Sequence, residues 1–308
     1  MTYVLTKSPR VYMAQDAGIS RALLSRRFQV FLQNPPHPLL VWKVNPPTVS
    51  SVPRRLWTYG FDGKWLGRGC VVLIHRDVTH KETLWWSDST SESMAAFSND
   101  IAPLKHLTKD NHPVGTISDW KPGIFRIMGE TWSGVYQQRC LVHVERDLKR
   151  LLPLHSPLIP TQRLREIAMH ICGLKDEGDR NYFFFSLLLW HNEYESLLKE
   201  RTIPNPGTTR KRWWYTHSNL RRAWRILTND TDSLFQYLDV PIIPATNNSL
   251  EGINSHLARR RGLSKEYQVA LMYWQLALSR CKTPSLRKQL WGIWKQVAAA
   301  SQTTQIVT

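Results

Sequence analysis

The amino-acid sequence predicts an α/β protein with a mixed β-sheet, an all-helical insertion and a helical segment at its start. Three runs rich in β-branched and aromatic residues follow one another between residues 55 and 89, and two more alternate with helical patterns up to residue 152. Residues 153–243 show helical periodicity alone, and helical patterns return at residue 248. Three antiparallel strands followed by alternating helices and strands imply a mixed sheet.

The charge of the chain points to a polyanionic partner. Its 308 residues include 41 Lys and Arg against 24 Asp and Glu, which gives a net charge of +17. Nucleic acid is the first candidate, and an anionic membrane surface is the second. The sequence has no secretory signal and no long apolar span, which weakens the membrane alternative. Four scattered cysteines fit free thiols in a reducing compartment and argue against a complete zinc site.

Residues 1–33 are predicted to be helical and resemble a helix-turn-helix. Ala14, Gly18 and Leu24 fall at the spacing of the small, turn and core positions of that motif. The second helix would direct three arginines toward DNA: Arg21, Arg26 and Arg27. A plain amphipathic pair of helices is the alternative. Residues 34–54 are predicted to be a linker, because they contain six prolines.

The first part of the core, residues 55–152, is predicted to contain five strands and three helices. The expected strands are 55–65, 70–79, 82–89, 114–120 and 136–144. The expected helices are about 91–106, one that begins at Pro122, and 145–153.

The helical insertion is predicted to span residues 153–243. Its run YFFFSLLLW, residues 182–190, is apolar over most of a helical circumference and predicts a deeply buried helix. Residues 244–308 then return to the core as three helices, predicted at 248–260, 265–281 and 284–300.

Three acidic residues are candidates for a metal site. Asp62 and Asp119 are expected at the ends of two strands that can be neighbours in a mixed sheet, and Glu251 in the first turn of a helix. Three carboxylates around an open position suit Mg²⁺ or Mn²⁺. Two such ions, about 3.5–4 Å apart, can support phosphodiester cleavage. The alternatives are turn residues for the aspartates, and a capping box of Asn248 with Glu251.

Other acidic residues are expected to have structural roles. Asp77 and Asp88 are interpreted as turn residues at strand ends, while Glu92, Asp100 and Glu130 are expected as charges on helix surfaces.

Four sequence blocks carry a resemblance to a known family. The blocks FDGKW, SDWKPGI, QRCLVHVERDLKR and TNNSLEGINSHLARRRG resemble the signatures of bacterial insertion-sequence transposases of the Mutator-like group, over residues 55–281. The resemblance implies an RNase H-like fold and a DDE triad of Asp62, Asp119 and Glu251 that binds two Mg²⁺ or Mn²⁺ ions. In one departure, Trp120 stands where the family usually has Gly.

The same resemblance implies partners and further site residues. Cys140 and His143 match the C-x-x-H pair of that group and are expected in or beside the site; a structural role in the core is the alternative. The partners would be double-stranded DNA at transposon ends and at the target, bound by a homodimer or a larger assembly. The expected location is the bacterial cytoplasm, in association with the nucleoid.

Two segments are predicted to contact DNA: residues 209–225, where basic and aromatic residues alternate, and the basic segment 256–262. Cations would neutralise phosphates and exposed tryptophans would stack on unpaired bases, although Trp213, Trp214 and Trp224 can instead belong to the core of the insertion. The predicted DNA contacts are Arg210, Lys211, Arg212, Trp213, Trp214, Arg221, Arg222, Arg259, Arg260 and Arg261.

The resemblance favours a DDE transposase that hydrolyses phosphodiester bonds and joins a 3′-hydroxyl to target DNA. Two alternatives remain open: an RNase H-like nuclease without strand transfer, and a catalytically inactive DNA-binding protein.

Overall fold

A computed structural model of the chain describes residues 10–51, 55–119, 121–205, 212–257 and 264–306. The chain divides into two compact units. The first unit comprises Met1–Val114, Pro122–Val135 and Asn248–Thr308, and the second comprises Gly115–Lys121 and Tyr136–Asn247. Among the described residues, no helix is long and apolar enough to cross a membrane.

The strands confirm the predicted α/β class and the mixed sheet. In the first unit, three strands pair antiparallel: β1 (Thr58–Gly67), β2 (Cys70–Asp77) and β3 (Glu82–Ser89). In the second unit, two strands pair parallel: β4 (Gly115–Ser118) and β5 (Tyr136–Arg139). The strand order is β3-β2-β1 within the first unit, and β4 and β5 are neighbours within the second. An RNase H-like fold stays a prediction.

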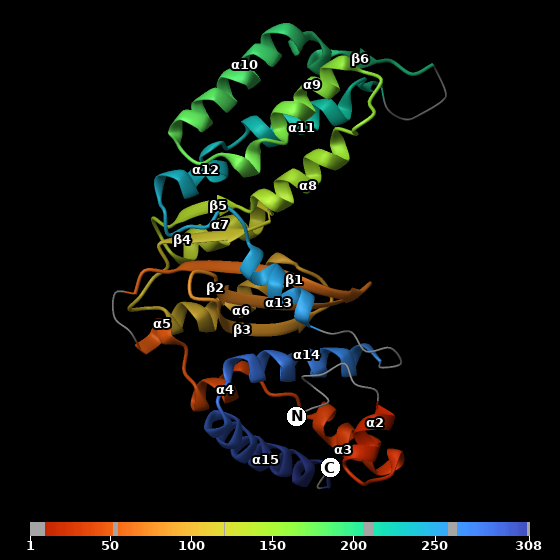
Figure 1. Cartoon of the computed structure of the whole chain (residues 1–308), viewed down its shortest axis with the longest axis vertical. Helices are drawn as coiled ribbons and strands as arrows, with labels where there is room; N and C mark the ends of the chain where they lie inside the picture. Colours follow the sequence, from red (N-terminus) through yellow and green to blue (C-terminus); the bar gives the residue numbers. More distant parts are fainter. Residues whose placement is uncertain (1–9, 52–54, 120, 206–211, 258–263, 307–308) are drawn as a thin grey trace. The chain divides into compact units, whose positions relative to one another are not determined.

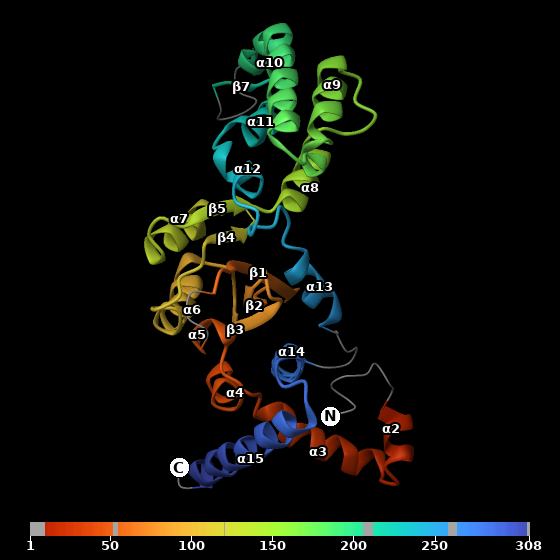
Figure 2. The same ribbon diagram turned by 60° about the vertical axis from the view of Figure 1, so that its left-hand side comes forward.

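Helices cover both faces of the antiparallel strands in the first unit. On one face, Phe61 and Leu73 join a buried cluster with Phe97 of α6 (Met94–Leu107) and Met128 of α7 (Pro122–Thr131). On the other face, α14 (Lys265–Arg280) packs against β3 and β2, and α13 (Asn248–His256) contacts β1 (Figure 2). Because side chains alternate along a strand, Asp62 points to the face opposite Phe61, the face that α13 contacts.

The start of the chain forms the predicted pair of helices, α2 (Arg10–Asp16) and α3 (Arg21–Gln33) (Figure 1). Ala14 and Leu24 are buried, and Gly18 between the helices has φ +62°, a left-handed conformation that glycine adopts without strain. The Ser20 hydroxyl accepts a hydrogen bond from the Leu23 amide and so caps α3. The last turns of α3 place Phe31 in a stack on Trp274, with ring centroids 3.8 Å apart. From the C-terminal helix α15 (Pro284–Ile306), Trp294 packs edge-on against Trp274 and tilted against Phe31.

The predicted linker over residues 34–54 is wrong in its structure, because this segment folds into helices α4 (Pro38–Val44) and α5 (Thr48–Ser51). Pro38 occupies the first turn of α4, where proline fits a helix because that amide needs no acceptor. Val41 and Val49 are buried, and the Trp42 indole donates to the Leu84 carbonyl. In residues 34–54, the prolines therefore mark the start of a helix and the break between two helices; they do not form an extended linker.

One predicted strand is shorter than expected. The run 136–144 was expected to be a strand throughout, but β5 ends at Arg139 and α8 (Leu141–Leu151) begins two residues later. Leu141, Val144 and Leu148 lie at i, i+3 and i+7 and are all buried, which is the spacing of a helix face.

Residues 153–243, predicted to be helices alone, are mainly helical with one short addition, and they belong to the second unit, which also contains β4 and β5. Its helices pack around one hydrophobic cluster and are α8, α9 (Ile159–Ala168), η1 (Ile171–Gly173), α10 (Glu177–Lys199), α11 (Ser218–Thr228) and α12 (Asp232–Asp239). The addition is a two-stranded antiparallel ladder of β6 (Arg201–Thr202) and β7 (Trp214–Tyr215), which the expectation of helices alone did not include.

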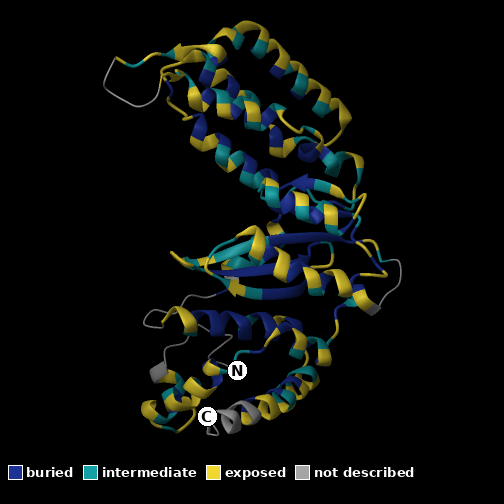
Figure 3. Ribbon diagram, turned by 180° about the vertical axis from the view of Figure 1, so that it is seen from behind, coloured by how far each residue is buried: buried dark blue, intermediate teal, exposed yellow. Residues whose placement is uncertain are grey.

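Helix α10 is less buried than its sequence suggests. Phe183 and Trp190 are buried, but Tyr182 and Phe185 are 74% and 55% exposed. Figure 3 shows exposed residues alternating with buried ones along α10. The prediction of a deeply buried helix is wrong within the second unit, because that unit's cluster contacts only one side of α10.

Candidate active site

Asp62 lies in the middle of β1 and is half-buried. It was expected at the strand end, but β1 continues to Gly67 and pairs Asp62 with Ile74 of β2. The Gly63 amide donates to Asp62 Oδ1 over 2.8 Å. The side-chain amide of Asn254 donates from Nδ2 to Asp62 Oδ2 over 2.7 Å. The two donors fix the direction of this carboxylate.

Helix α13 carries Glu251 in its first turn, as predicted. Asn248 is the first residue of the helix, so it does not occupy the predicted capping position. Glu251 and Asn254 are three residues apart and therefore neighbours on one helix face. Because Asn254 bonds Asp62, that helix face meets β1, and the structure brings the elements of Asp62 and Glu251 together. Asn254 was missed by the sequence analysis, although its spacing from Glu251 was a usable signal.

Asp119 directly follows β4 and belongs to the second unit. Burial raises the pKa of its carboxyl above the ordinary range, and the nearby charge of His143 partly opposes that rise. Lys121 Nζ lies 3.8 Å from Asp119 Oδ2. Asp62 and Glu251 belong to the first unit, so the meeting of all three carboxylates stays a prediction.

Cys140 and His143 lie beside Asp119 at the junction of β5 and α8. The Cys140 amide donates to the carbonyl of Ser118, the residue before Asp119, over 2.9 Å. The Cys140 thiol is buried, and its sulfur accepts from the Asn247 amide over 3.2 Å. Cys140 therefore holds two backbone segments together, while His143 acts on the charge of Asp119.

We expect His143→Asn to raise the pKa of Asp119. Asparagine keeps the polarity but removes the positive charge that opposes protonation of the carboxyl. The measurement is a titration of the Asp119 carboxyl carbon by NMR, with His155→Asn as the matched control in the same unit. An Asp119 pKa that stays constant or falls in His143→Asn would contradict this electrostatic role.

The other acidic residues are engaged in structural contacts. Asp77 accepts from the His80 amide over 3.0 Å, as expected of a turn residue, and Glu130 is an exposed helix charge, as expected. Asp88 lies within β3 and accepts from the Tyr273 hydroxyl over 2.7 Å, so it is not a turn residue. Glu92 was expected on a helix surface, but it precedes α6 and accepts from the Trp65 indole.

Asp100 was expected on a helix surface, and that expectation is wrong. It is 5% exposed, on the side of α6 that faces β2 and β3. Its carboxylate accepts hydrogen bonds from His75, Trp85 and Ser87. A polar residue on a helix that covers a sheet can thus be buried when the strands supply donors.

The predicted DNA-binding residues divide into three groups. Arg21, Arg26 and Arg27 are exposed on α3, and Arg212 and Arg222 are exposed in the second unit. Arg221 is half-buried over the ring of Tyr215, with 4.0 Å from its guanidinium carbon to the ring centroid. Outside the described residues lie Arg210, Lys211, Arg259, Arg260 and Arg261.

The tryptophans of the basic segment differ in exposure. Trp213 and Trp214 are 41% and 39% exposed, and the Arg201 guanidinium carbon lies 4.1 Å from the centroid of the Trp213 ring. Trp224 packs on Trp190 and on His191 inside the helical cluster. The core interpretation therefore holds for Trp224.

Across the described ranges, no group of three or more His, Cys, Asp or Glu side chains lies close enough to hold a metal ion. No model of a known protein family matches this chain. No curated protein matches its sequence either.

Proposed function

We propose that the chain is a metal-dependent DNA transposase of the DDE type. It would bind the ends of a mobile element, hydrolyse a phosphodiester bond and join the freed 3′-hydroxyl to target DNA. The observation that carries the proposal is the hydrogen bond from Asn254 to Asp62, which sets the helix of Glu251 against the strand of Asp62. The order and content of the four sequence blocks give it independent support.

The donors around Asp62 fit a hard divalent cation. Asp62 supplies carboxylate oxygens, and the Oδ1 atom of Asn254 is buried without a hydrogen-bond partner in the described part of the chain. A buried amide oxygen without a donor is costly, and Mg²⁺ or Mn²⁺ prefers oxygen ligands. When bound there, the ion would supply positive charge to activate water and stabilise the leaving oxygen.

Each of the three acidic side chains would supply oxygen ligands to the metal ions. Asp62, oriented by Gly63 and Asn254, and Glu251 would provide ligand oxygens from the first unit. Asp119 would provide them from the second unit, where burial favours its protonated form and His143 favours the ionised form that a ligand needs. Cys140 would hold the backbone next to Asp119.

A cationic cavity of the second unit fits the DNA backbone. It has a volume of about 330 Å³ and is lined by Arg139, Arg222, Arg225, Ile226 and Asn229. Arg139 is buried, and this burial lowers the pKa of its guanidinium to about 10, although Asp230 and Asp147 oppose the effect. Three guanidinium groups with no carboxylate in the lining attract phosphate oxygens.

Cleavage and strand transfer can be assayed separately. Duplex DNA from both flanks of the coding region would be incubated with the protein and Mg²⁺ or Mn²⁺, with EDTA as the control. We expect nicks that need the ion, and joining when pre-cut ends are supplied with target DNA. Nicking without joining would favour the nuclease, and binding without nicking would favour the inactive DNA-binding protein.

We expect Asn254→Ala to weaken metal dependence more than DNA binding. The substitution removes the donor that orients Asp62 and one candidate oxygen ligand. Substitution of a residue that orients a metal ligand typically lowers the affinity for the metal by about 10–100-fold. The Mg²⁺ concentration for half-maximal cleavage should therefore rise by about that factor. The control is Ser255→Ala, on the exposed side of the same helix. Equal Mg²⁺ dependence in both variants would remove Asn254 from the site.

A further inference from the structure

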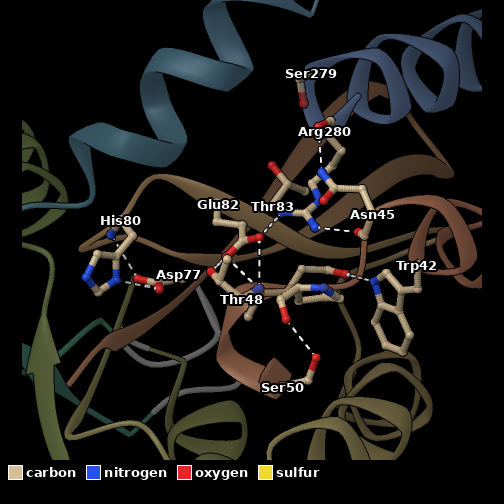
Figure 4. A network of polar contacts seen from close by, with 12 residues as sticks. Trp42, Asn45, Thr48, Ser50, Asp77, His80, Glu82, Thr83, Ser279 and Arg280 are labelled. Atoms are coloured by element: carbon tan, nitrogen blue, oxygen red, sulfur yellow. Dashed lines mark hydrogen bonds and ion pairs between the residues drawn. The ribbon is translucent and has the colours of Figure 1, made fainter. Parts of the chain in front are cut away.

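A second cavity in the first unit is polar and mostly lined by cations. Its volume is about 410 Å³, and it lies where the ends of β2, β3 and α14 meet α4, α5 and α13. Figure 4 shows part of its wall, including Asn45, Thr48, His80, Glu82 and Arg280. The lining contains five Lys or Arg side chains and one carboxylate: Arg55, Arg76, Lys81, Arg280 and Lys282, with Glu82.

The carboxylates at this cavity are already engaged. Glu82 pairs with Arg280 and accepts from the amide of Thr48 over 3.1 Å. Arg55 lies 4.0 Å from Asp77, which also pairs with His80. These pairs join strands and helices and leave no carboxylate for the remaining cations.

Three cations therefore remain without an ion pair. In the described ranges, Arg76, Lys81 and Lys282 have no carboxylate oxygen within 4.0 Å. Lys81 and Lys282 are exposed at the rim, so water solvates them at little cost. Arg76 is only 6% exposed, so its charge has lost most of its water.

Arg76 is held rigidly with part of its guanidinium unused. Its Nε donates to the Ser249 hydroxyl over 2.7 Å, and its Nη1 donates to the Thr83 hydroxyl over 2.9 Å. Its Nη2 makes no hydrogen bond within the described part of the chain. Burial lowers the pKa of this guanidinium to about 10; the negative charges of Asp77 and Glu82 oppose that effect, and the like charge of Arg280 adds to it. A bound anion would satisfy Nη2 and relieve this repulsion.

We propose that this cavity binds a phosphate group. A phosphate offers several acceptor oxygens and up to two negative charges, which match a fixed arginine donor and two mobile ammonium groups. The volume exceeds that of one phosphate and leaves room for an ester substituent. The group could come from a DNA backbone or from a free phosphate compound. The proposal needs neither the metal site nor DNA cleavage.

The test compares two double variants that lose the same charge. Lys81→Asn with Lys282→Gln removes the two rim ammonium groups and leaves the buried arginines intact. Asparagine suits position 81 because Lys81 has φ +56°, a conformation that asparagine tolerates. The control is Lys105→Gln with Lys109→Gln, two exposed lysines outside the cavity.

Calorimetric titration with pyrophosphate provides the first measurement. We expect the cavity variant to bind roughly tenfold more weakly than the wild-type protein, about threefold for each ammonium, and the control variant to match the wild type. Titration of duplex DNA over a range of salt concentrations then separates the two sources. The salt dependence is the slope of the logarithm of the DNA-binding constant against the logarithm of the salt concentration. If the group belongs to DNA, the magnitude of this slope falls by about 0.9 for each phosphate that the cavity variant no longer neutralises, beyond the change in the control.

Every outcome bears on the proposal. Weaker pyrophosphate binding with unchanged DNA binding identifies a free phosphate compound, and a lower salt dependence of DNA binding, with or without weaker pyrophosphate binding, identifies the DNA backbone. If the cavity variant and the control behave alike with both probes, the cavity does not bind phosphate and its charges serve only the fold. Because cleavage is not measured, that failure would leave the proposed transposase activity untouched.

Discussion

Asp62→Asn should slow metal-dependent DNA cleavage by at least about 10³-fold while DNA binding changes by less than about twofold. Losing a group that stabilises the charge developing in the transition state lowers the reaction rate by about 10²–10³-fold. Losing a metal ligand also lowers the occupancy of the site by the metal ion. The shape of the site should survive. Asparagine still accepts from Gly63, and the Asn254 amide can turn its unpartnered Oδ1 toward the new Nδ2.

The control for each variant makes the same change of charge at an exposed residue. Asp110→Asn removes a carboxylate that is exposed in the same unit, and it should cleave at the wild-type rate. Glu251→Gln should behave like Asp62→Asn, with Glu130→Gln as its exposed counterpart. Asp119→Asn tests the ligand that the second unit is predicted to provide. Full cleavage by any of the three triad variants would remove that residue from the predicted site.

Much of the fold follows from local patterns in the sequence. The strands β1, β2 and β3 were predicted within a few residues, because β-branched and aromatic runs between polar turns have few alternatives. Residues 34–54 were predicted less well. Proline both interrupts and starts helices, and burial of Val41 and Val49 by distant residues decides which outcome holds.

The candidate site was predictable in part, for a physical reason. The three acids could be selected by type and by resemblance, but their supporting contacts join residues far apart in the sequence. Asn254 meets Asp62 across 192 positions, and Ser249 meets Arg76 across 173. Only the fold supplies such pairs. Local spacing could suggest Asn254 through its position on the face of Glu251, but nothing local marks Arg76 as buried.

The burial of Asp100 shows most clearly what the sequence pattern missed, and it carries the largest expected effect on stability. His75 Nε2 lies 3.0 Å from one carboxylate oxygen, Trp85 donates to the other over 2.9 Å, and the Tyr59 hydroxyl bonds His75 in turn. Asp100→Asn replaces an acceptor with a donor inside this network. Leaving the buried His75 and Ser87 groups poorly paired should lower the free energy of unfolding by about 3 kcal/mol at neutral pH.

The pH dependence gives this prediction a second measurement. Burial alone would raise the pKa of Asp100, but the hydrogen bonds from His75, Ser87 and Trp85 outweigh it and hold the pKa below its ordinary value. A lowered folded pKa stabilises the protein above the unfolded pKa, about 3.9, and this stabilisation is lost as the pH falls through the folded value. Urea unfolding should therefore show the gap between wild-type protein and Asp100→Asn narrowing below about pH 4. The exposed control Asp110→Asn should show no such gap at any pH. If Asp100→Asn and the control unfold at the same urea concentration at neutral pH, the network does not stabilise the first unit.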